Sequence, residues 1–412
     1  MAFCAIVSNM KDKKVEKLIA AEKARQKKVV NLIASENYVS ADVLKALGSE
    51  SVNKYAEGYA GARYYGGNEV MDQIENLCKE RALKLFGLDS KVWAVNVQSL
   101  SGSPANVAVY TAVLPLGAKI MGMSLDQGGH LTHGHKASVT GKWWKQIPYG
   151  LDKDSEVLDY DELLKIAMLE KPDMVVAGYT AYSKIIDWHK MKMVADIAGA
   201  HLHIDMSHIA GLVAGGVYPS PFEYADTVMT TTHKTLRGPR SALIFSRIDD
   251  RKLNEKIDKA VFPGMQGGPH MNQIAAVAVA LGEAMKPDFK KYAKQVIKNA
   301  KVLADTLSKK GWRIVSKGTD MHLFLVDTWS PPAGGGKGIS GKEASDLLEK
   351  NGIIVNKNTI PFDTRGPVDP SGIRIGTAAE TTRGKKEKDM IKIAEKIDKI
   401  LHSPRPNGRD PL

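Results

Sequence analysis

Short, continuous apolar runs recur along residues 92–246 of the chain, and helical or polar segments separate most of them. Runs of this kind are typical of strands that are buried on both faces of a sheet. They predict strands at residues 92–97, 173–178, 202–206, 227–232 and 242–246. Because strands alternate with helices, the pattern predicts an α/β fold with a mostly parallel central sheet sandwiched by helices.

Helical periodicity is clearest in segments where apolar residues recur every three or four positions. A stripe over residues 70–86 predicts a helix that ends at Gly87. The apolar segment 271–285 leads into a lysine-rich helix at 289–309. At residues 385–401 the isoleucines fall on one face, so the lysines form the solvated side of an amphipathic helix.

The pattern changes after residue 285, where strands and helices predict a smaller α+β domain. We therefore expect an N-terminal helical arm at 1–35, a large domain at 36–285 and a small domain at 286–412. The strands expected in the small domain lie at 312–316, 322–327 and 352–356. A glycine-rich stretch at 330–338 is expected to be a mobile loop.

Composition places the chain among ordinary globular proteins. It has 412 residues, of which 43% are hydrophobic and 25% are charged. Its longest apolar stretches, 209–217 and 274–281, are much shorter than the ~20 residues that cross a bilayer, so we expect no membrane partner and a cytoplasmic protein. Two cysteines, Cys4 and Cys78, predict neither a disulfide framework nor a metal site.

The formal net charge of +12 raises the question of an acidic partner. Much of the excess lies in segments where lysines alternate with glutamates, which is typical of solvated helices. No interleaving of basic and aromatic residues accompanies the charge, so a nucleic-acid partner is not expected.

Candidate chemistry begins at the end of the predicted strand 227–232, where His233 and Lys234 follow three threonines. A single lysine at such a junction is usually just solvated. However, Asp205 also ends a predicted strand, and Ser101 follows another. The carboxyl ends of parallel strands form the edge at which α/β enzymes bind ligands.

The segment Ser101-Gly102-Ser103-Pro104 predicts the start of a helix, with Ser103 as N-cap and Pro104 at the first helical position. A helix start offers free N–H groups to a phosphate. Taken singly, an ordinary cap, a loop-capping Asp205 and a core His208 are the simpler interpretations. Together, a lysine, a carboxylate and a phosphate-binding turn are what pyridoxal phosphate requires of a protein.

Seven longer motifs then carry a family resemblance. They are LIASENY, NKYAEGYAGARYYGGNE, GGHLTHG, HIDMSHIAGLVAGGVYP, TTTHKTLRGPR, VFPGMQGGP and SGIRIGT, spread from Leu32 to Thr377. Their identity and order resemble serine hydroxymethyltransferase, a fold-type-I pyridoxal phosphate enzyme. The resemblance implies interconversion of serine and glycine, with tetrahydrofolate as the one-carbon carrier.

The resemblance also implies roles at the cofactor. Lys234 is similar to the lysine that carries pyridoxal phosphate, and Thr231 and His233 to its neighbours. Asp205 resembles the partner of the ring nitrogen, and His130 the imidazole stacked on the ring. The other implied cofactor-binding residues are Ser101, Gly102 and Ser103 at the phosphate, Thr180, and His208 at the ring oxygen, with Arg240 as a structural neighbour.

Substrate positions follow in the same way. Arg374 resembles the arginine that binds the substrate carboxylate, a task that suits a bidentate guanidinium. Residues implied to build a site across the interface of a homodimer, or of a tetramer, are Ser35, Tyr55, Glu57, Tyr65, Gly267 and Gly268. Glu57 is similar to the group that handles protons, and Leu125, Gly129 and Asn358 to residues around the folate.

Departures from the family pattern leave an alternative open. They are Leu100, Asp126, Gln127, Arg237 and the glycine-rich stretch at 330–338. A folate-independent β-hydroxy amino acid aldolase of the same fold would keep Lys234, Asp205 and Arg374 but lack the folate positions. Glu57, Tyr65 and Asn358 argue against that alternative, and the intact cofactor set argues against a non-catalytic basic protein.

Overall fold

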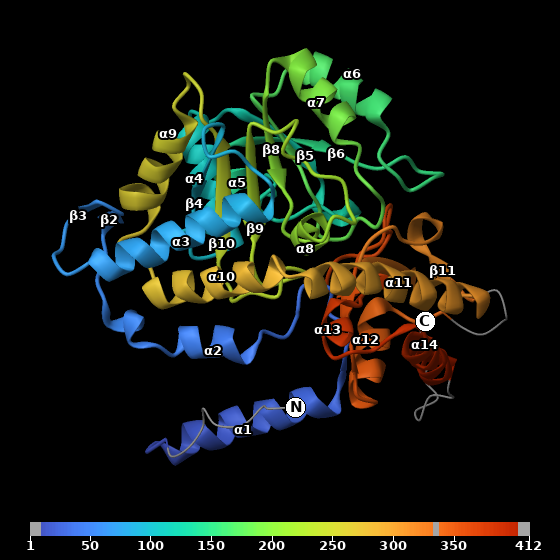
Figure 1. The fold of residues 1–412 in the computed structure, drawn as a ribbon. Coiled ribbons are helices and arrows are strands. Elements are labelled where there is room, and N and C mark those ends of the chain that lie inside the picture. The colour runs from blue at the N-terminus through green and yellow to red at the C-terminus, as the bar shows by residue number, and fades with distance from the viewer. Residues whose placement is uncertain (1–9, 333–337, 403–412) are drawn as a thin grey trace.

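The computed structural model describes residues 10–332 and 338–402, and a seven-stranded sheet lies at its centre (Figure 1). In spatial order the strands are β4 (Trp93–Asn96), β10 (Ala242–Arg247), β9 (Thr227–Thr231), β8 (His201–Asp205), β7 (Met174–Ala177), β5 (Lys119–Met123) and β6 (Lys145–Tyr149). β10 runs antiparallel to both of its neighbours, and all other strands of this sheet run in one common direction. The predicted mostly parallel sheet is confirmed.

Two strands of this sheet, β5 and β6, were not predicted from the sequence. Gly122 interrupts the apolar run of β5, and Pro148 lies in β6. β6 is the edge strand, where a proline without an N–H group is tolerated. Gly122 is required because a Cβ there would lie 2.7 Å from the carbonyl oxygen of His133.

Helices cover both faces of the sheet, as the continuous apolar strands require. One face packs on α3 (Glu69–Leu85), α7 (Trp188–Ala198) and α10 (Met271–Ala284). The other face packs on α4 (Gly102–Val113) and α9 (Leu253–Lys259). Alternate residues of β7 show the division, since Val175 enters the first core whereas Met174 and Val176 enter the second. Other helices of this part are α2 (Ala41–Leu47), α5 (Val139–Trp143), α6 (Tyr160–Glu170) and α8 (Ala210–Ala214).

A second, antiparallel sheet lies in the C-terminal part of the chain. Its order is β11 (Arg313–Ile314), β12 (Leu323–Asp327), β15 (Gly372–Gly376) and β14 (Asn356–Asn358). It shares a core with α11 (Pro287–Lys309), α12 (Gly341–Lys350) and α14 (Glu387–His402). α13 (Ala378–Thr382) follows β15, a strand that was not predicted.

Two long-range features connect the part of the chain around the large sheet with the part around the small sheet. α11 places Phe289 in the core of the large sheet and Leu303 in the core of the small one. β1 (Val30–Asn31) pairs with β13 (Ile353–Ile354), so the start of the chain is fastened beside the small sheet. α1 (Lys13–Lys28) has no buried residue and projects from the body (Figure 1). The domain boundaries expected at 35 and 285 stay predictions.

Further predictions from the sequence concern the cysteines, the glycine-rich stretch and membrane-spanning segments. Within the described residues, Cys78 is buried and unpaired, whereas Cys4 and most of the glycine-rich stretch lie outside them. None of the helices described is both long and apolar enough to cross a membrane.

After β7 the chain turns at Gly178, whose φ is 131°, and a Cβ there would lie 2.0 Å from the carbonyl oxygen of Asp205. A glycine is therefore needed beside the residue that ends β8.

Candidate active site

A cavity of about 290 Å³ opens where β4, β8 and β9 end. Because β4 and β9 run in the same direction as β8, residues that follow these strands meet at one edge of the sheet. The predicted residues that line this cavity are Ser35, Ser101, Gly102, Ser103, His130, Thr180, Asp205, His208, Thr231, His233, Lys234 and Arg240. The structure thus brings together the lysine, the carboxylate and the serine turn.

Lys234 follows β9 and points its amine into the cavity wall. Its Nζ donates to Oγ1 of Thr231 at 2.8 Å, and its carbonyl oxygen accepts from Nδ2 of Asn37 at 2.9 Å. Burial of the ammonium group, reinforced by Arg374 and Arg240 against the opposing charge of Asp205, lowers the pKa of Lys234 to about 8. About a tenth of this amine is therefore unprotonated and nucleophilic at pH 7, far more than for an ordinary lysine.

The serine turn begins α4, although two residues earlier than predicted. Ser101, with φ −165° and ψ 168°, is the N-cap, and its carbonyl oxygen accepts from the N–H of Ala105 at 3.1 Å. The prediction of Ser103 as N-cap was wrong because Pro104 is tolerated anywhere in the first turn, where N–H groups have no intrahelical partner. A Cβ on Gly102 would lie 2.7 Å from Cγ2 of Thr231, so the glycine lets α4 begin against β9.

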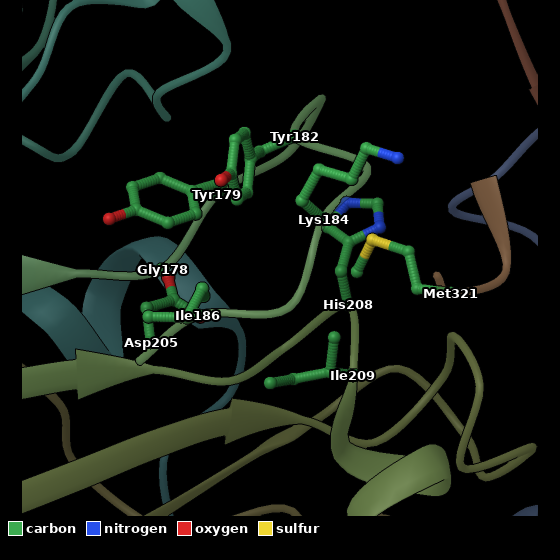
Figure 2. A pocket seen from close by; sticks show the side chains of 9 residues that line it. All are labelled: Gly178, Tyr179, Tyr182, Lys184, Ile186, Asp205, His208, Ile209 and Met321. Atoms are coloured by element: carbon green, nitrogen blue, oxygen red, sulfur yellow. The ribbon is translucent and has the colours of Figure 1, made fainter. Parts of the chain in front are cut away.

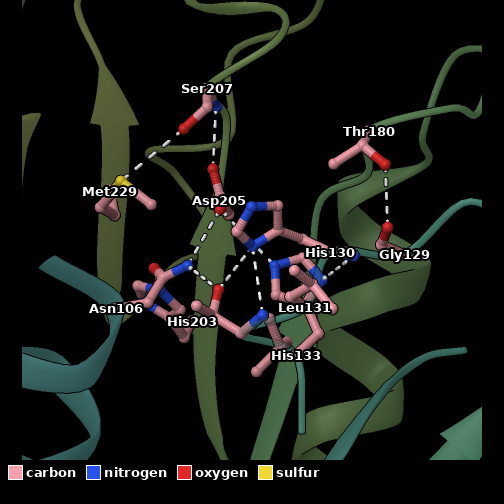
Figure 3. Close-up of polar contacts among 12 residues, drawn as sticks. Asn106, Gly129, His130, Leu131, His133, Thr180, His203, Asp205, Ser207 and Met229 are labelled. Atoms are coloured by element: carbon pink, nitrogen blue, oxygen red, sulfur yellow. Dashed lines mark hydrogen bonds and ion pairs between the residues drawn. The ribbon is translucent and has the colours of Figure 1, made fainter. Parts of the chain in front are cut away.

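Asp205, at the end of β8, is held by three donors (Figure 3). Oδ1 accepts from the N–H of Ser207 at 3.0 Å, and Oδ2 accepts from Nδ2 of Asn106 at 3.1 Å. Oδ2 also lies 3.5 Å from Nε2 of His133. Burial raises the pKa of this carboxyl, but His133, His130 and Lys234 together hold it well below its usual range. Asp205 is consequently an ionised carboxylate inside the cavity.

His130 and His133 lie on the loop that follows β5. Nδ1 of His130 accepts from the N–H of Thr132 at 3.2 Å, so the ring proton sits on Nε2. By the same reasoning, Nδ1 of His133 accepts from the N–H of His130 at 3.4 Å, which leaves its Nε2–H directed at Asp205. Burial, and then the charge of His133, lowers the pKa of His130 to about 4, so its ring is neutral.

His208 lines the cavity and contacts His322, the residue that precedes β12. The rings stack at 25° with Nδ1 of His208 3.2 Å from Nε2 of His322. Burial lowers the pKa of His322 to about 3 and lowers that of His208 as well, so both rings are neutral. Behind His208 and Asp205 is a cavity of only about 10 Å³, bordered by Tyr182 and Met321 (Figure 2). That space is no larger than one water molecule requires.

Arg374 reaches the site from β15 of the small sheet. Its Nη1 donates to the carbonyl oxygen of Thr180 at 2.6 Å, and its Nε donates to Oδ1 of Asn356 at 3.0 Å. Burial lowers the pKa of Arg374 to about 10, which leaves the guanidinium charged at neutral pH. Oγ1 of Thr180 donates to the carbonyl oxygen of Gly129 at 2.8 Å, so the two sheets meet through this residue.

Asn358 and Leu125 do not line the cavity within the described part of the chain. Asn358 lies on β14, paired with Gly372 of β15. Leu125 opens the short turn η2 (Leu125–Gln127), where Oε1 of Gln127 accepts from the N–H of Leu151 at 2.7 Å. The departure at Gln127 therefore fastens this turn to the loop after β6.

A separate cluster contains Tyr55, Glu57, Tyr65, Gly267 and Gly268. The hydroxyl of Tyr55 donates to Oε1 of Glu57 at 3.2 Å, and the rings of Tyr55 and Tyr65 meet edge to face with centroids 5.0 Å apart. A Cβ on Gly268 would lie 3.3 Å from the Tyr55 ring, so the two glycines pack directly on Tyr55 and Glu57. Among the described residues, none of the five lines the cavity, and Tyr55 and Tyr65 are about half exposed.

Sequence reasoning missed four residues that support the site: Asn37, Asn106, His133 and His322. Asn37 and His133 lie inside motifs that were recognised, three residues or fewer from assigned positions. Asn106 offered a usable signal, since it is the one polar residue in the run Ala105–Tyr110 at the start of a helix. His322 gave none, because only the fold brings it to His208.

Comparison with known proteins decides the family. The family model described as serine hydroxymethyltransferase matches residues 8–397. The chain belongs to the serine hydroxymethyltransferase family.

Serine hydroxymethyltransferases from distant organisms align with nearly the whole chain. The protein of that name from Acidobacterium capsulatum is 52% identical over 390 residues, which cover 95% of this chain and 88% of that protein. The one from Koribacter versatilis is 51% identical over 385 residues, or 93% and 87% of the two chains. The fission yeast Schizosaccharomyces pombe has a "Probable serine hydroxymethyltransferase, cytosolic" that is 48% identical over 406 residues, or 95% and 85%.

Serine hydroxymethyltransferases use pyridoxal phosphate, and the cavity fits this group. It offers an amine with a lowered pKa, an ionised carboxylate, and the hydroxyls and free N–H groups at the start of α4. Among the described residues, the buried Nδ1 of His233 also lacks a hydrogen-bond partner in this cavity. A cavity of this size suits one small aromatic phosphate.

The lowered pKa of Lys234 predicts how the apo-protein captures pyridoxal phosphate. Only the unprotonated amine attacks an aldehyde, so the capture rate should rise with pH, reach half its plateau near pH 8 and stay nearly constant between pH 9 and 10. A lysine with the ordinary pKa of 10.5 would instead gain about eightfold over that last unit. Stopped-flow absorbance measures the rate, and division by the rate constant of the unprotonated amine of Nα-acetyl-lysine at the same pH removes the titration of the cofactor itself. A continued rise between pH 9 and 10 would contradict the burial argument.

Proposed function

We propose that this chain uses Lys234, Asp205 and Arg374 to move the hydroxymethyl carbon of serine to and from tetrahydrofolate. As a member of its family it is a pyridoxal-phosphate-dependent glycine hydroxymethyltransferase, which interconverts serine and glycine with tetrahydrofolate as co-substrate. The observation that carries the residue assignment is the meeting of an amine of lowered pKa with an ionised carboxylate in one cavity.

Bound pyridoxal phosphate supplies an aldehyde that joins amino groups and a ring that accepts electrons. Lys234 would hold the aldehyde through its amine. The ionised Asp205 would keep a proton on the ring nitrogen, and His130 would cover the ring. Ser101, Gly102 and Ser103 would bind the phosphate, Thr180 would pack beside the cofactor, and His208 would donate a hydrogen bond to the ring oxygen.

Arg374 orients the amino acid. Its guanidinium is charged and buried, and its Nη2 has no hydrogen-bond partner among the described residues, so it can bind a carboxylate. Ser35, on the cavity wall, adds a hydroxyl. With the amino and carboxylate groups both held, the bond from the α-carbon to the hydroxymethyl carbon is directed at the reacting groups.

Tyr55, Glu57, Tyr65, Gly267 and Gly268 complete the site of the partner copy. Three facts support this: the five cluster together, two of them are about half exposed, and none lines the cavity of its own chain in the part described. The functional unit is then a homodimer with shared active sites, alone or within a tetramer. Leu125, Gly129 and Asn358 seat the folate in this arrangement.

A cytoplasmic location is part of the same proposal. It is supported by the name of the fission yeast relative, which includes the word cytosolic. The alternative of a folate-independent aldolase is not favoured, since the relatives of about 50% identity are named serine hydroxymethyltransferase.

Dependence on folate tests the transferase assignment. Tetrahydrofolate should accelerate serine cleavage at least about a hundredfold, and Glu57→Gln should lower that folate-dependent rate by about 10²–10⁴-fold because it removes a proton-transfer group and keeps the shape. Cofactor absorbance and allo-threonine cleavage should change little. Glu50→Gln, at an exposed glutamate of η1 (Glu50–Asn53), is the matched control. Serine cleavage at equal rates with and without tetrahydrofolate would make the protein an aldolase.

Subunit mixing tests the shared site. Lys234→Ala and Glu57→Gln chains are each impaired, but a hybrid dimer holds one site with neither change if Glu57 acts on the partner's cofactor. Random exchange makes half of the dimers hybrids, so activity should recover to about a quarter of the wild-type value. Native mass spectrometry confirms the exchange. Activity that stays at the level of the parent variants, with hybrids present, would show that each chain completes its own site.

A further inference from the structure

A row of buried polar side chains ends at Asp205 and His130, which line the cavity, and Figure 3 shows its part from His203 and Asn106 to these two residues. It begins at His201 and passes through Thr227 and His203 to Asn106 on α4. From Asn106 one branch reaches Asp205 at 3.1 Å, and another reaches Oγ1 of Thr132 at 2.8 Å. Asn106 is fully buried and does not line the cavity, so it acts on a ligand only through these neighbours.

The orientation of the Asn106 amide follows from its partners. The ionised Asp205 only accepts hydrogen bonds, so the amide must present its NH₂ group to it. The amide oxygen then faces Nε2 of His203 at 2.9 Å, and that nitrogen must carry the proton. Burial lowers the pKa of His203 to about 3, so the ring is neutral and its Nδ1 accepts from the hydroxyl of Thr227 at 2.9 Å. The oxygen of Thr227 accepts in turn from Nε2 of His201 at 2.8 Å.

The second branch is equally determined. The other N–H of Asn106 is donated to Oγ1 of Thr132, which directs the Thr132 hydroxyl proton at Nδ1 of His130, 2.7 Å away. That nitrogen already accepts from the N–H of Thr132. Two donors on Nδ1 fix both the plane of the His130 ring and the position of its proton on Nε2.

We propose that Asn106 is a positioning residue whose single amide orients both Asp205 and His130. One N–H holds the carboxylate that would pair with the ring nitrogen of the cofactor. The other, through Thr132, directs a second donor at Nδ1 and so fixes the plane of the imidazole that would cover the ring. His203 locks the amide against rotation. The role rests on the proposed functions of Asp205 and His130, so its test includes a measurement made without cofactor.

Asn106→Asp tests the proposal because it keeps the shape and removes both donors. The new carboxyl group lies against Asp205, so the pair shares a proton at neutral pH, and Thr132 loses its donor. The matched control is Asn299→Asp on α11. Asn299 is also fully buried, and its amide donates to Thr381 at 2.8 Å and to the carbonyl oxygen of Lys385 at 2.9 Å, away from the cavity.

Two readouts separate a positioning role from a merely structural one. In the apo-protein, ¹⁵N spectra of the histidine side chains, assigned with His130→Asn, should show the Nε2–H tautomer of His130 in all three proteins. The Nδ1 signal of His130 should shift in Asn106→Asp, because the new carboxyl group draws the Thr132 hydroxyl proton away from it, and should stay unchanged in Asn299→Asp. The dissociation constant of pyridoxal phosphate should rise at least tenfold in Asn106→Asp and less than threefold in Asn299→Asp. Equal behaviour of the two variants in both readouts would overturn the proposal.

Thr132→Val provides an independent test if Asn106→Asp fails to fold. It removes only the hydroxyl that links Asn106 to His130 and keeps the backbone N–H of residue 132. The Nδ1 signal of His130 should therefore shift, while its Nε2–H tautomer and the Asn106 contact with Asp205 remain. An unchanged His130 signal in Thr132→Val would overturn the proposal. Because the spectra need no cofactor, a wrong assignment of the reaction would leave this result standing.

Discussion

The burial of a lysine ammonium group and an aspartate in one cavity is the constraint on which the rest of the site depends. Isolated charges are costly to bury, and each of these two is made tolerable by the other and by hydrogen bonds. Burial lowers the pKa of Lys234, whereas His133, His130 and Lys234 keep Asp205 ionised. The burial and the neighbouring charges therefore produce a nucleophilic amine and an ionised carboxylate that can pair with a protonated ring.

This pair exists only because the sheet has a specific order. β8 and β9 are parallel neighbours, so Asp205 and the segment before Lys234 leave the sheet at the same edge. The small sheet then closes the site, because Arg374 on β15 donates to Thr180 and His322 stacks on His208. Since α11 packs in both cores, the two sheets are held in the positions that these contacts require.

The sequence was informative where chemistry lies next to a strong local pattern. Lys234 and Asp205 follow apolar strands, and their meeting could be predicted because parallel strands end at one edge. Local pattern failed at β5 and β6, where Gly122 and Pro148 break the apolar runs, and at the α4 cap, where a proline is compatible with several positions of the first turn. These errors concern places where tertiary contacts decide between local choices of similar energy.

Residues that act on other residues were the hardest to predict. Asn106 and His322 become meaningful only when buried partners distant in sequence, such as Asp205 and His208, meet them in space. Tyr55 and Glu57 present the opposite case, because the resemblance assigned them to an active site whereas the described chain keeps them away from its own cavity. The homodimer that we propose would reconcile the two observations.

The assignment of Lys234 as the residue that carries the cofactor can be tested directly. Borohydride reduction of the holoenzyme fixes pyridoxal phosphate to the amine that holds it, and peptide mass spectrometry locates the added mass. We expect one modified peptide, the one that contains Lys234, with stoichiometry near one per chain, and no such modification in Lys234→Ala. Stoichiometric label on any other lysine of the wild-type protein would contradict the assignment.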